Sequence, residues 1–337
     1  MIQRITLPRS LSLSNCLQFS REMFNTPEDD EYEFDFGNMI WAPPFSMVYL
    51  AAQINRFRRE RPQALYRALN PDTNTYAAHM GFFEAFDLHY GNLVGQALGS
   101  DTYVPITEIR RNQLEAEAST VGDAIEENAG RLAEMLTREN QSQTFQTLRY
   151  SIREILRNSI EHSGEDSVLL CAQYWPTRER VEVGIVDCGI GIRQGLARNP
   201  HHEINTDEQA LHLSMMPGVS GVAYQGAPTP HHDDVWANSG YGLFMTSRIC
   251  MEAGAFFIAS GNASTLIAGN DRNSYEQTFN GTAIRMLIDI NRVQQLDNKL
   301  RQLHLEGQEI AAGITGTNTQ GASPASVSVS VGSTDTS

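Results

Sequence analysis

The stretch Arg153–Ser163, which reads R-E-I-L-R-N-S-I-E-H-S, is the part of the chain around which the fold is organised. Its apolar residues recur at helical spacing, so it is expected to form an amphipathic helix. Glu154 and Asn158 are four residues apart and therefore lie one turn above each other on the same face. A carboxylate and a carboxamide placed in this way can hold a hydrated Mg²⁺ ion and orient a water molecule. Taken alone, such a pair is also common on solvated helix faces.

Three further motifs follow this helix along the chain. Residues 181–186 form a strand-like run that ends in the loop 187–192, which reads D-C-G-I-G-I. Residues 238–243 read N-S-G-Y-G-L and open an apolar, helix-like run. The motif N-G-T at residues 280–282 leads into a last strand. Taken singly, these motifs are also explained by an Asp-Gly turn, a helix N-cap at Ser239 and the start of an edge strand.

In this order, the patterns E-x-x-x-N, D-x-G-x-G, G-x-G-L and G-T resemble the ATP-binding domain of the GHKL superfamily, over residues 140–292. The resemblance implies an α/β sandwich of the Bergerat fold that binds ATP and Mg²⁺. It implies that Glu154 is catalytic and polarises the attacking water or hydroxyl group, and that Asn158 is the Mg²⁺ ligand. The residues that it implies for nucleotide binding are Asn158, Asp187, Gly189, Gly191, Ser239, Gly240, Tyr241, Gly242, Leu243 and Thr282.

General chemistry is compatible with these implied roles. A buried carboxylate such as Asp187 can accept a charge-assisted hydrogen bond from the adenine amino group, which is stronger than a neutral one and selects the base. Gly189 and Gly191 lack the Cβ atoms that would keep the backbone away from a ligand. Glycines that open a helix bring free N–H groups and the positive end of the helix dipole towards phosphate. Mg²⁺ prefers oxygen ligands and keeps several waters, so the Asn158 carboxamide and the phosphates suffice to hold it.

The segment between the two glycine motifs, residues 193–239, is rich in Gly, Pro and His. It suits the mobile lid of GHKL proteins, and we expect it to be mobile without nucleotide because it has few long apolar residues to bury. Two histidine pairs occur in it. The first is His201-His202, and the second is His231-His232, which is followed by two aspartates. Adjacent histidines point apart and no zinc-binding motif accompanies them, so the sequence predicts no metal other than Mg²⁺.

The N-terminal part, residues 1–100, is expected to form an α/β domain because strand-like and helix-like runs alternate in it. We expect strands at residues 2–7, 32–36 and 64–69, and helices at 12–24, 46–59 and 75–86. The loop after the second strand, followed by Trp41 and a helix, resembles the STAS fold of anti-sigma-factor antagonists. Phosphorylatable STAS domains carry an acceptor serine in this loop, but Ser46 falls slightly late and follows a stiff Pro-Pro pair. We therefore expect a degenerate STAS-like domain that binds a protein partner.

The remaining boundaries follow from composition. Residues 101–140 are expected to be a helical connector, because residues 108–139 are charged and helix-prone, while residues 103–106 suggest a strand. Such a helix either joins two copies into a homodimer or simply presents a solvated face. The ATP-binding domain is expected over residues 141–304. Residues 305–337 are expected to be a disordered tail, because most of them are Gly, Ser, Thr or Ala and lack the apolar mass that offsets the entropy of ordering.

Composition excludes several classes of function. The 337-residue chain has a formal net charge of −15, which argues against nonspecific nucleic-acid binding, because that relies on Lys and Arg contacts to phosphates. No apolar run approaches the ~18–20 residues of a membrane-spanning helix, and no signal-peptide pattern is visible. The four cysteines are scattered, which predicts neither disulfides nor a zinc site. We expect a soluble, cytoplasmic protein.

The GHKL resemblance leaves several classes of function to distinguish. A histidine kinase needs a phosphoacceptor histidine on a preceding helix, but no histidine occurs between His89 and His162. Gyrase- and MutL-like machines need a large transducer domain after the last strand, and we expect none here. The preferred interpretation is a signalling protein kinase that phosphorylates a protein serine or threonine. The alternative is an ATPase, or ATP-gated switch, that controls the binding of a partner protein.

Overall fold

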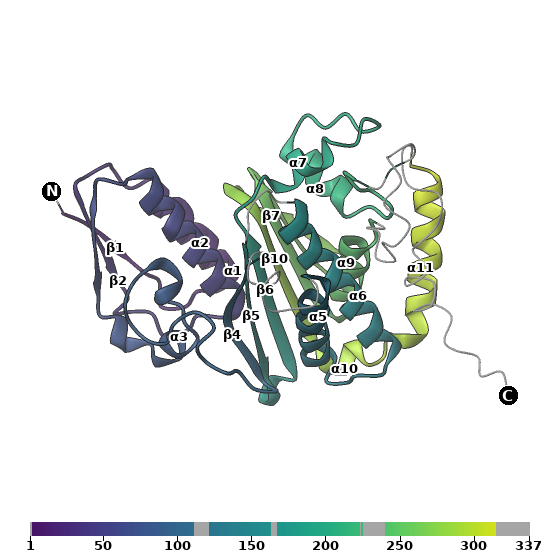
Figure 1. Ribbon diagram of the computed structural model, residues 1–337, viewed down its shortest axis with the longest axis horizontal. Helices are drawn as coiled ribbons and strands as arrows, with labels where there is room; N and C mark the ends of the chain where they lie inside the picture. The colour runs from purple at the N-terminus through teal and green to yellow at the C-terminus, as the bar shows by residue number, and fades with distance from the viewer. Residues whose placement is uncertain (1, 111–120, 163–166, 223, 225–239, 315–337) are drawn as a thin grey trace.

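The computed structural model describes residues 2–110, 121–162, 167–222, 224 and 240–314. The chain forms a mixed α/β structure with two sheets, which lie in alternating layers with the helices (Figure 1). A three-stranded sheet is followed by helices α1 and α2, then by a seven-stranded sheet, and then by a layer of helices that includes α5, α6 and α9. Of the described helices, none is long and apolar enough to cross a membrane.

The N-terminal unit is a parallel sheet in the order β1-β2-β3, connected by two crossover helices. Its elements are β1 (Ile2–Thr6), α1 (Leu13–Phe24), β2 (Glu31–Asp35), α2 (Pro44–Glu60), β3 (Leu65–Leu69) and α3 (Thr75–His79). The strand pattern is clear at β2, where Tyr32 and Phe34 are buried and the acidic residues between them are only partly buried. The single helix expected over residues 75–86 is wrong, because Gly81 takes a left-handed backbone (φ +84°) and separates α3 from a 3-10 turn at Glu84–Phe86.

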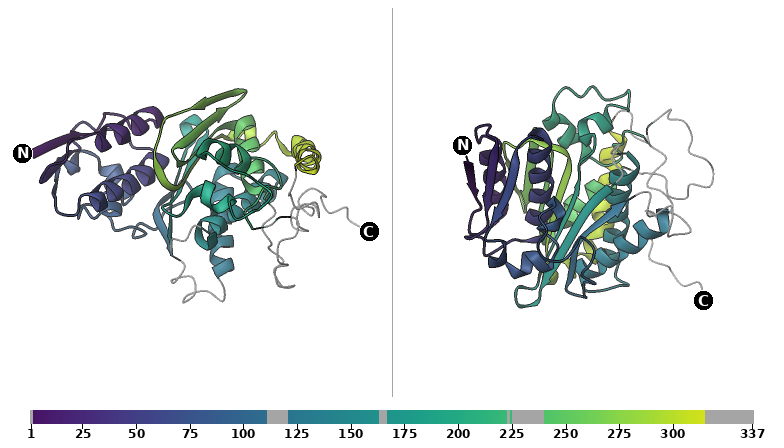
Figure 2. Two further views of the ribbon diagram at one scale, coloured as in Figure 1. Left: turned by 90° about the horizontal axis from the view of Figure 1, so that it is seen from above. Right: turned by 60° about the vertical axis from the view of Figure 1, so that its left-hand side comes forward.

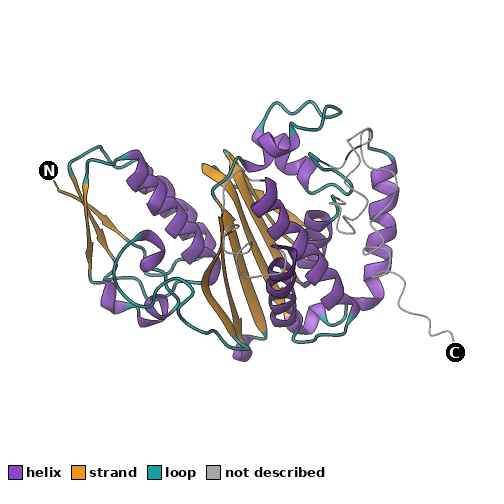
Figure 3. Cartoon of the chain, viewed as in Figure 1, coloured by secondary structure: helices purple, strands orange, loops and turns teal. Residues whose placement is uncertain are grey.

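The larger sheet is antiparallel throughout, in the order β4-β5-β6-β10-β7-β8-β9. Its strands are β4 (Tyr103–Arg110), β5 (Ser167–Trp175), β6 (Arg180–Asp187), β7 (Gly254–Gly261), β8 (Ala263–Ala268), β9 (Asp271–Ser274) and β10 (Phe279–Asp289). The helices that follow β4 are α5 (Val121–Thr137), α6 (Gln143–Arg157), α7 (Gly191–Leu196), α8 (Asp207–Ser214), α9 (Gly242–Ala253), α10 (Ile290–Val293) and α11 (Asp297–Ala312). Figure 3 shows α5, α6 and α9 together on one side of this sheet.

Two expected boundaries are wrong. Residues 101–140 are not a helical connector, because β4 is the edge strand of the larger sheet and α5 packs along α6 with buried Leu132 and Leu136. The strand expected at residues 103–106 is longer, Tyr103–Arg110, and continues past a shift in the β4–β5 register at residues 104–107. Helix α11 continues to Ala312, seven residues beyond the expected start of the tail, because Leu303 and Ala311 are buried. Residues 315–337 lie outside the described part of the chain.

The two sheets share a core through α2, which lies across the face of the larger sheet opposite α6 and α9 (Figure 2). The approach is closest at Gly184 on β6, where an added Cβ atom would lie 2.5 Å from the Cα atom of Phe45. Glu182, also on β6, accepts a hydrogen bond from the Phe45 N–H (3.2 Å) and pairs with Arg285 (2.7 Å). Pro43 offers no side-chain cap to α2, so a carboxylate from the other unit binds its first turn.

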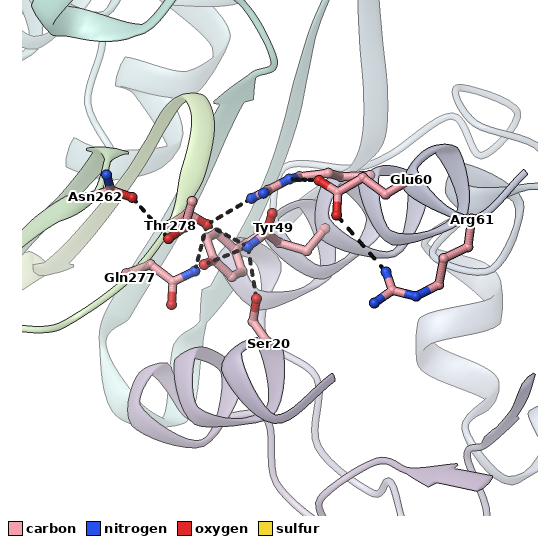
Figure 4. Close-up of polar contacts among 9 residues, drawn as sticks. Ser20, Tyr49, Glu60, Arg61, Asn262, Gln277 and Thr278 are labelled. Atoms are coloured by element: carbon pink, nitrogen blue, oxygen red, sulfur yellow. Dashed lines mark hydrogen bonds and ion pairs between the residues drawn. The ribbon is translucent and has the colours of Figure 1, made fainter. Parts of the chain in front are cut away.

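A second polar contact joins the two units near the middle of α2, where Ser20 and Thr278 approach the helix (Figure 4). The side-chain nitrogen of buried Gln53 donates to the Ser20 hydroxyl (2.8 Å) and to the Thr278 carbonyl oxygen (3.0 Å). Ser46 is buried at the start of α2 and donates its hydroxyl to the Leu11 carbonyl oxygen (2.7 Å). Ser46 is therefore buried inside the N-terminal unit, next to Phe45, which packs against β6.

Candidate functional site

A cavity of about 140 Å³ lies at the ends of β6 and β10, between α6, α7 and α9. Six of the sequence-predicted site residues line it, which are Asn158, Asp187, Gly191, Gly240, Leu243 and Thr282. Gly189, Tyr241 and Gly242 are adjacent to these in sequence but do not line the cavity. Ser239 lies outside the described residues. The structure therefore brings together motifs that are more than a hundred residues apart along the chain.

Asp187 ends β6, and its carboxylate is buried at the cavity wall. Its Oδ1 accepts a hydrogen bond from the Gly189 N–H (3.0 Å), and its Oδ2 accepts one from the Ser159 hydroxyl (3.1 Å). Thr282 on β10 hydrogen-bonds to it through both backbone and side chain. Burial raises the pKa of Asp187 to about 6, although these hydrogen bonds act in the opposite direction. Thr282, a residue that the sequence predicts for the site, thus lies at the carboxylate. Ser159 is a site residue that the sequence motifs missed.

Asn158 ends α6 and begins a π-helical turn, Asn158–His162. The helix expected over residues 153–163 is therefore not regular, and the widened turn places Asn158 at the cavity while Ser159 reaches Asp187. Single π-helical turns are frequent at functional sites, because they redirect side chains relative to a regular helix. Asn158 is exposed, whereas Glu154 one turn earlier is buried.

Glu154 does not line the cavity but lies under the first turn of α9. Its Oε1 accepts a hydrogen bond from the Tyr150 hydroxyl. An added Cβ atom on Gly242 would lie 2.5 Å from its Oε2, so the glycine allows α9 to begin directly against this carboxylate. The Arg153 guanidinium lies 4.8 Å from the centre of the Tyr150 ring. Burial excludes a solvated helix face for Glu154, while its place beside α9 is one that the motif did not predict.

The loop before α9 is held by tight backbone contacts. Gly240 has φ +71°, and an added Cβ atom would lie 2.7 Å from the Val219 carbonyl oxygen. The Gly218 N–H donates to the Gly240 carbonyl oxygen (3.2 Å). Tyr241 is the N-cap residue of α9 and its side chain makes no capping hydrogen bond, while the capping expected of Ser239 lies outside the described residues. The first N–H groups of α9 thus begin beside the cavity.

Ser260 on β7 is a second residue that the motifs missed. Its hydroxyl donates to the Gly281 carbonyl oxygen (2.7 Å) and accepts from the Ile192 N–H (2.9 Å). Gly281 has φ +111°, and an added Cβ atom would lie 2.1 Å from the Asp187 carbonyl oxygen. Ser260 therefore joins the loop after β6 to the start of β10, and Gly281 allows the two to meet at Asp187.

The first half of the expected lid is folded. Helix α8 begins with a capping box between Thr206 and Gln209 and packs on β7 and β8 with buried Leu211. The expectation that this segment buries little is wrong for α8, because Ala210 and Leu211 on this helix are buried. The second histidine pair, residues 231–234, lies outside the described residues. In the part of the chain that the structure describes, no group of three His, Cys, Asp or Glu side chains could hold a metal ion.

A larger cavity of about 1190 Å³ lies between α2 and the ends of β4, β5 and β6. Its charged lining residues balance in sign: Arg58, Arg59 and Arg110 against Glu84, Asp87 and Glu108. Arg110 pairs with Glu108 (2.7 Å) and Arg58 with Asp87 (3.5 Å). Because these pairs leave no dominant charge, the larger cavity does not select a class of ligand as the first one does.

No protein-family model matches this chain, and no curated protein matches it at a significant level. The smaller cavity is therefore interpreted from its own geometry. One part of its wall is a buried carboxylate that can accept hydrogen bonds, and another is the glycine loop at the start of a helix. Such a cavity can bind a ligand with a hydrogen-bond donor in one part and an anionic group in another.

Proposed function

We propose that this chain is a regulatory protein of the GHKL superfamily that binds Mg²⁺ and ATP and phosphorylates a protein serine or threonine. In this proposal, the larger sheet with α6 and α9 is the Bergerat sandwich. The observation that carries the proposal is the buried Asp187 carboxylate, held by Ser159, Gly189 and Thr282 in a cavity that Asn158 and Gly240 also line.

Recognition of adenine rests on Asp187. An ionised carboxylate accepts a hydrogen bond from the adenine amino group, and burial strengthens that bond and makes it selective. Ser159, Gly189 and Thr282 fix the orientation of the carboxylate, so little is lost in ordering it when the base binds. The apolar side chains of Ile155, Leu243 and Ile284 in the lining suit the faces of the ring.

Binding of the phosphates rests on the opposite features. The N–H groups at the start of α9 and the helix dipole favour an anion beside Gly240. The exposed Asn158 side chain would bind Mg²⁺ through its carboxamide oxygen, and Mg²⁺ would take its other ligands from phosphates and water. Mg²⁺ would neutralise charge on the phosphate chain during transfer.

Glu154 would act as the base that accepts a proton from the attacking hydroxyl group or water. Its position under the first turn of α9 puts the carboxylate next to the proposed phosphate site, and the Tyr150 hydroxyl fixes one of its oxygens. Tyr150 is therefore proposed as a positioning residue that acts through Glu154.

The alternative function, an ATP-gated switch, is favoured by one contact. Helix α11 lies against the start of α9: an added Cβ atom on Gly307 would lie 2.7 Å from Phe244, and the rings of His304 and Tyr241 are 6.1 Å apart. A change at the glycine loop on nucleotide binding would be felt by α11, which could then alter the binding of a partner protein.

The proposed roles of the remaining parts follow from what the structure buries. A protein partner would engage the STAS-like N-terminal unit at a place other than Ser46, since this residue is 1% exposed and hydrogen-bonds to Leu11 within the unit. A homodimer would not use the apolar face of α5, because it is buried against α6.

Calorimetry with Mg²⁺-ATP tests the binding function, and Asp187→Ala is the decisive variant. Loss of one charge-assisted hydrogen bond costs about 1.5–3 kcal/mol, so ATP affinity should fall about tenfold or more. The far-UV circular dichroism spectrum of the variant should match that of the wild type, which shows that the fold is kept. Equal affinity of wild type and variant would reject the assignment. Incubation with γ-phosphate-labelled ATP and candidate protein substrates then separates the two functions: label on a protein supports the kinase, and label only in free phosphate supports the switch.

A further inference from the structure

The lining of the smaller cavity contains two ionisable side chains, Asp187 and Arg198. Arg198 follows α7 and is exposed at the cavity rim. Among the described residues it has no hydrogen-bond or ion-pair partner, in contrast to Arg193 on α7, which lies 3.9 Å from Asp207. A cation at the rim of a proposed nucleotide cavity, with no ion-pair partner in the described part of the chain, can bind an anionic ligand.

The backbone near Arg198 is tied to the glycine loop by a short chain of contacts. The next residue, Asn199, is buried and donates its side-chain N–H to the Ser220 carbonyl oxygen (3.0 Å). Ser220 follows Val219, whose carbonyl oxygen lies beside Gly240. Gly221 approaches α7 so closely that an added Cβ atom would lie 2.1 Å from the Gly195 carbonyl oxygen. These contacts hold Arg198 on the side of the cavity where the anionic group is expected.

We propose that Arg198 binds the phosphate chain of the nucleotide and thereby distinguishes a nucleoside phosphate from the free nucleoside. This inference rests on the proposed function of the cavity. The planar guanidinium group carries a permanent charge and matches two phosphate oxygens at once, which a lysine does not. It supplements the N–H groups of α9, which contribute only partial charges.

Calorimetric titration of the full chain with adenosine, ADP and Mg²⁺-ATP at constant ionic strength tests this inference. Arg198→Gln should lower affinity for ATP about tenfold or more and for ADP by a smaller factor, with adenosine changed by less than about twofold. Arg198→Lys should lie between wild type and Arg198→Gln for ATP. Arg193→Gln is the matched control, a neighbouring arginine that does not line the cavity, and should change all three affinities by less than about twofold.

Two outcomes would overturn the inference while leaving nucleotide binding intact. Arg198→Gln could bind ATP as wild type does, which would leave the phosphates to α9 and Mg²⁺ alone. It could also lose affinity for adenosine and ATP by the same factor, which would make Arg198 a structural part of the cavity. A wild-type protein that binds none of the three ligands would instead overturn the proposed function, and the inference with it.

Discussion

Removal of the Glu182 carboxylate should destabilise the whole protein, because this group joins its two sheets. Glu182 is 2% exposed on β6, pairs with Arg285, and accepts the hydrogen bond of the Phe45 N–H at the start of α2. The substitution Glu182→Ala leaves Arg285 without its counter-charge at 15% side-chain exposure. It also leaves the first turn of α2 without an acceptor.

The magnitude follows from these two losses. Removal of one partner from a buried ion pair costs about 3–5 kcal/mol, because the other charge stays buried and unpaired. Loss of an N-terminal helix cap costs about 1 kcal/mol, although the two terms share one carboxylate and do not simply add. A total of about 3–5 kcal/mol is a large part of the ~5–15 kcal/mol that stabilises a typical domain. Double replacement of Glu182 and Arg285 by alanine should cost less than the sum of the single replacements, because no charge is left unpaired.

Urea unfolding followed by tryptophan fluorescence measures this effect, since Trp41 and Trp175 contact each other across the two units (5.4 Å between rings). The control is Glu33→Ala on β2, which removes the ion-pair partner of Arg4 on β1. Arg4 is 59% exposed, so its charge stays solvated without Glu33. This control should cost less than about 1 kcal/mol. A cost below about 1 kcal/mol for Glu182→Ala, or separate unfolding of the N-terminal unit at wild-type stability of the rest, would refute the reasoning.

Three further predictions concern the cavity. Burial raises the pKa of Asp187 to about 6, and only the ionised form accepts the adenine hydrogen bond. Adenosine affinity should therefore be constant above pH ~6 and fall about tenfold per pH unit well below it. Asp187→Asn should abolish this pH dependence in calorimetry. Glu154→Ala should keep the wild-type affinity for ATP and slow turnover by about 10²–10⁴ in steady-state kinetics. Tyr150→Phe should slow turnover when it is introduced into the wild type, but not when it is introduced into the Glu154→Ala variant. Additive effects of the two substitutions would contradict the positioning role of Tyr150. Asn158→Ala should remove the Mg²⁺-dependent part of ATP binding, and equal Mg²⁺ dependence in both proteins would show another ligand.

Much of the site could be predicted from the sequence because glycine has few structural substitutes. Gly240 and Gly281 occupy left-handed backbone or close approaches that a Cβ atom would block, so their spacing records the shape of the loops directly. The position of Asp187 at the wall of the site could be predicted because it directly follows the mostly apolar run 181–186, which marks the end of a strand. Ser159 and Ser260 were missed because a serine has many possible roles. Their hydroxyls act across 28 and 21 residues of sequence, and no local pattern reports such contacts.

The joining of the two units could not be predicted from local patterns. In sequence, β6 is apolar apart from Arg180, Glu182 and the terminal Asp187, which indicates that both faces are covered but not what covers them. The partner α2 lies more than a hundred residues earlier, and its buried polar residues Ser46 and Gln53 look like ordinary helix-surface residues until their partners are known. The edge strand β4 was predicted only over residues 103–106, because pairing with β5 and the register shift within it decide its length more than its own composition does.

Strand β6 connects these two aspects of the molecule. Alternate side chains of a strand point to opposite faces, so Val181, Val183 and Ile185 enter the core under α6 and α9. Asp187 lies on the same face of the strand as these three residues. The residues between them, Glu182, Gly184 and Val186, face α2. A single strand thus bears the proposed adenine-binding carboxylate on one face and the contacts to the N-terminal unit on the other. Because close-packed cores transmit small shifts, a nucleotide that moves the end of β6 would alter the fit of α2, which makes the N-terminal unit a part of the proposed nucleotide response.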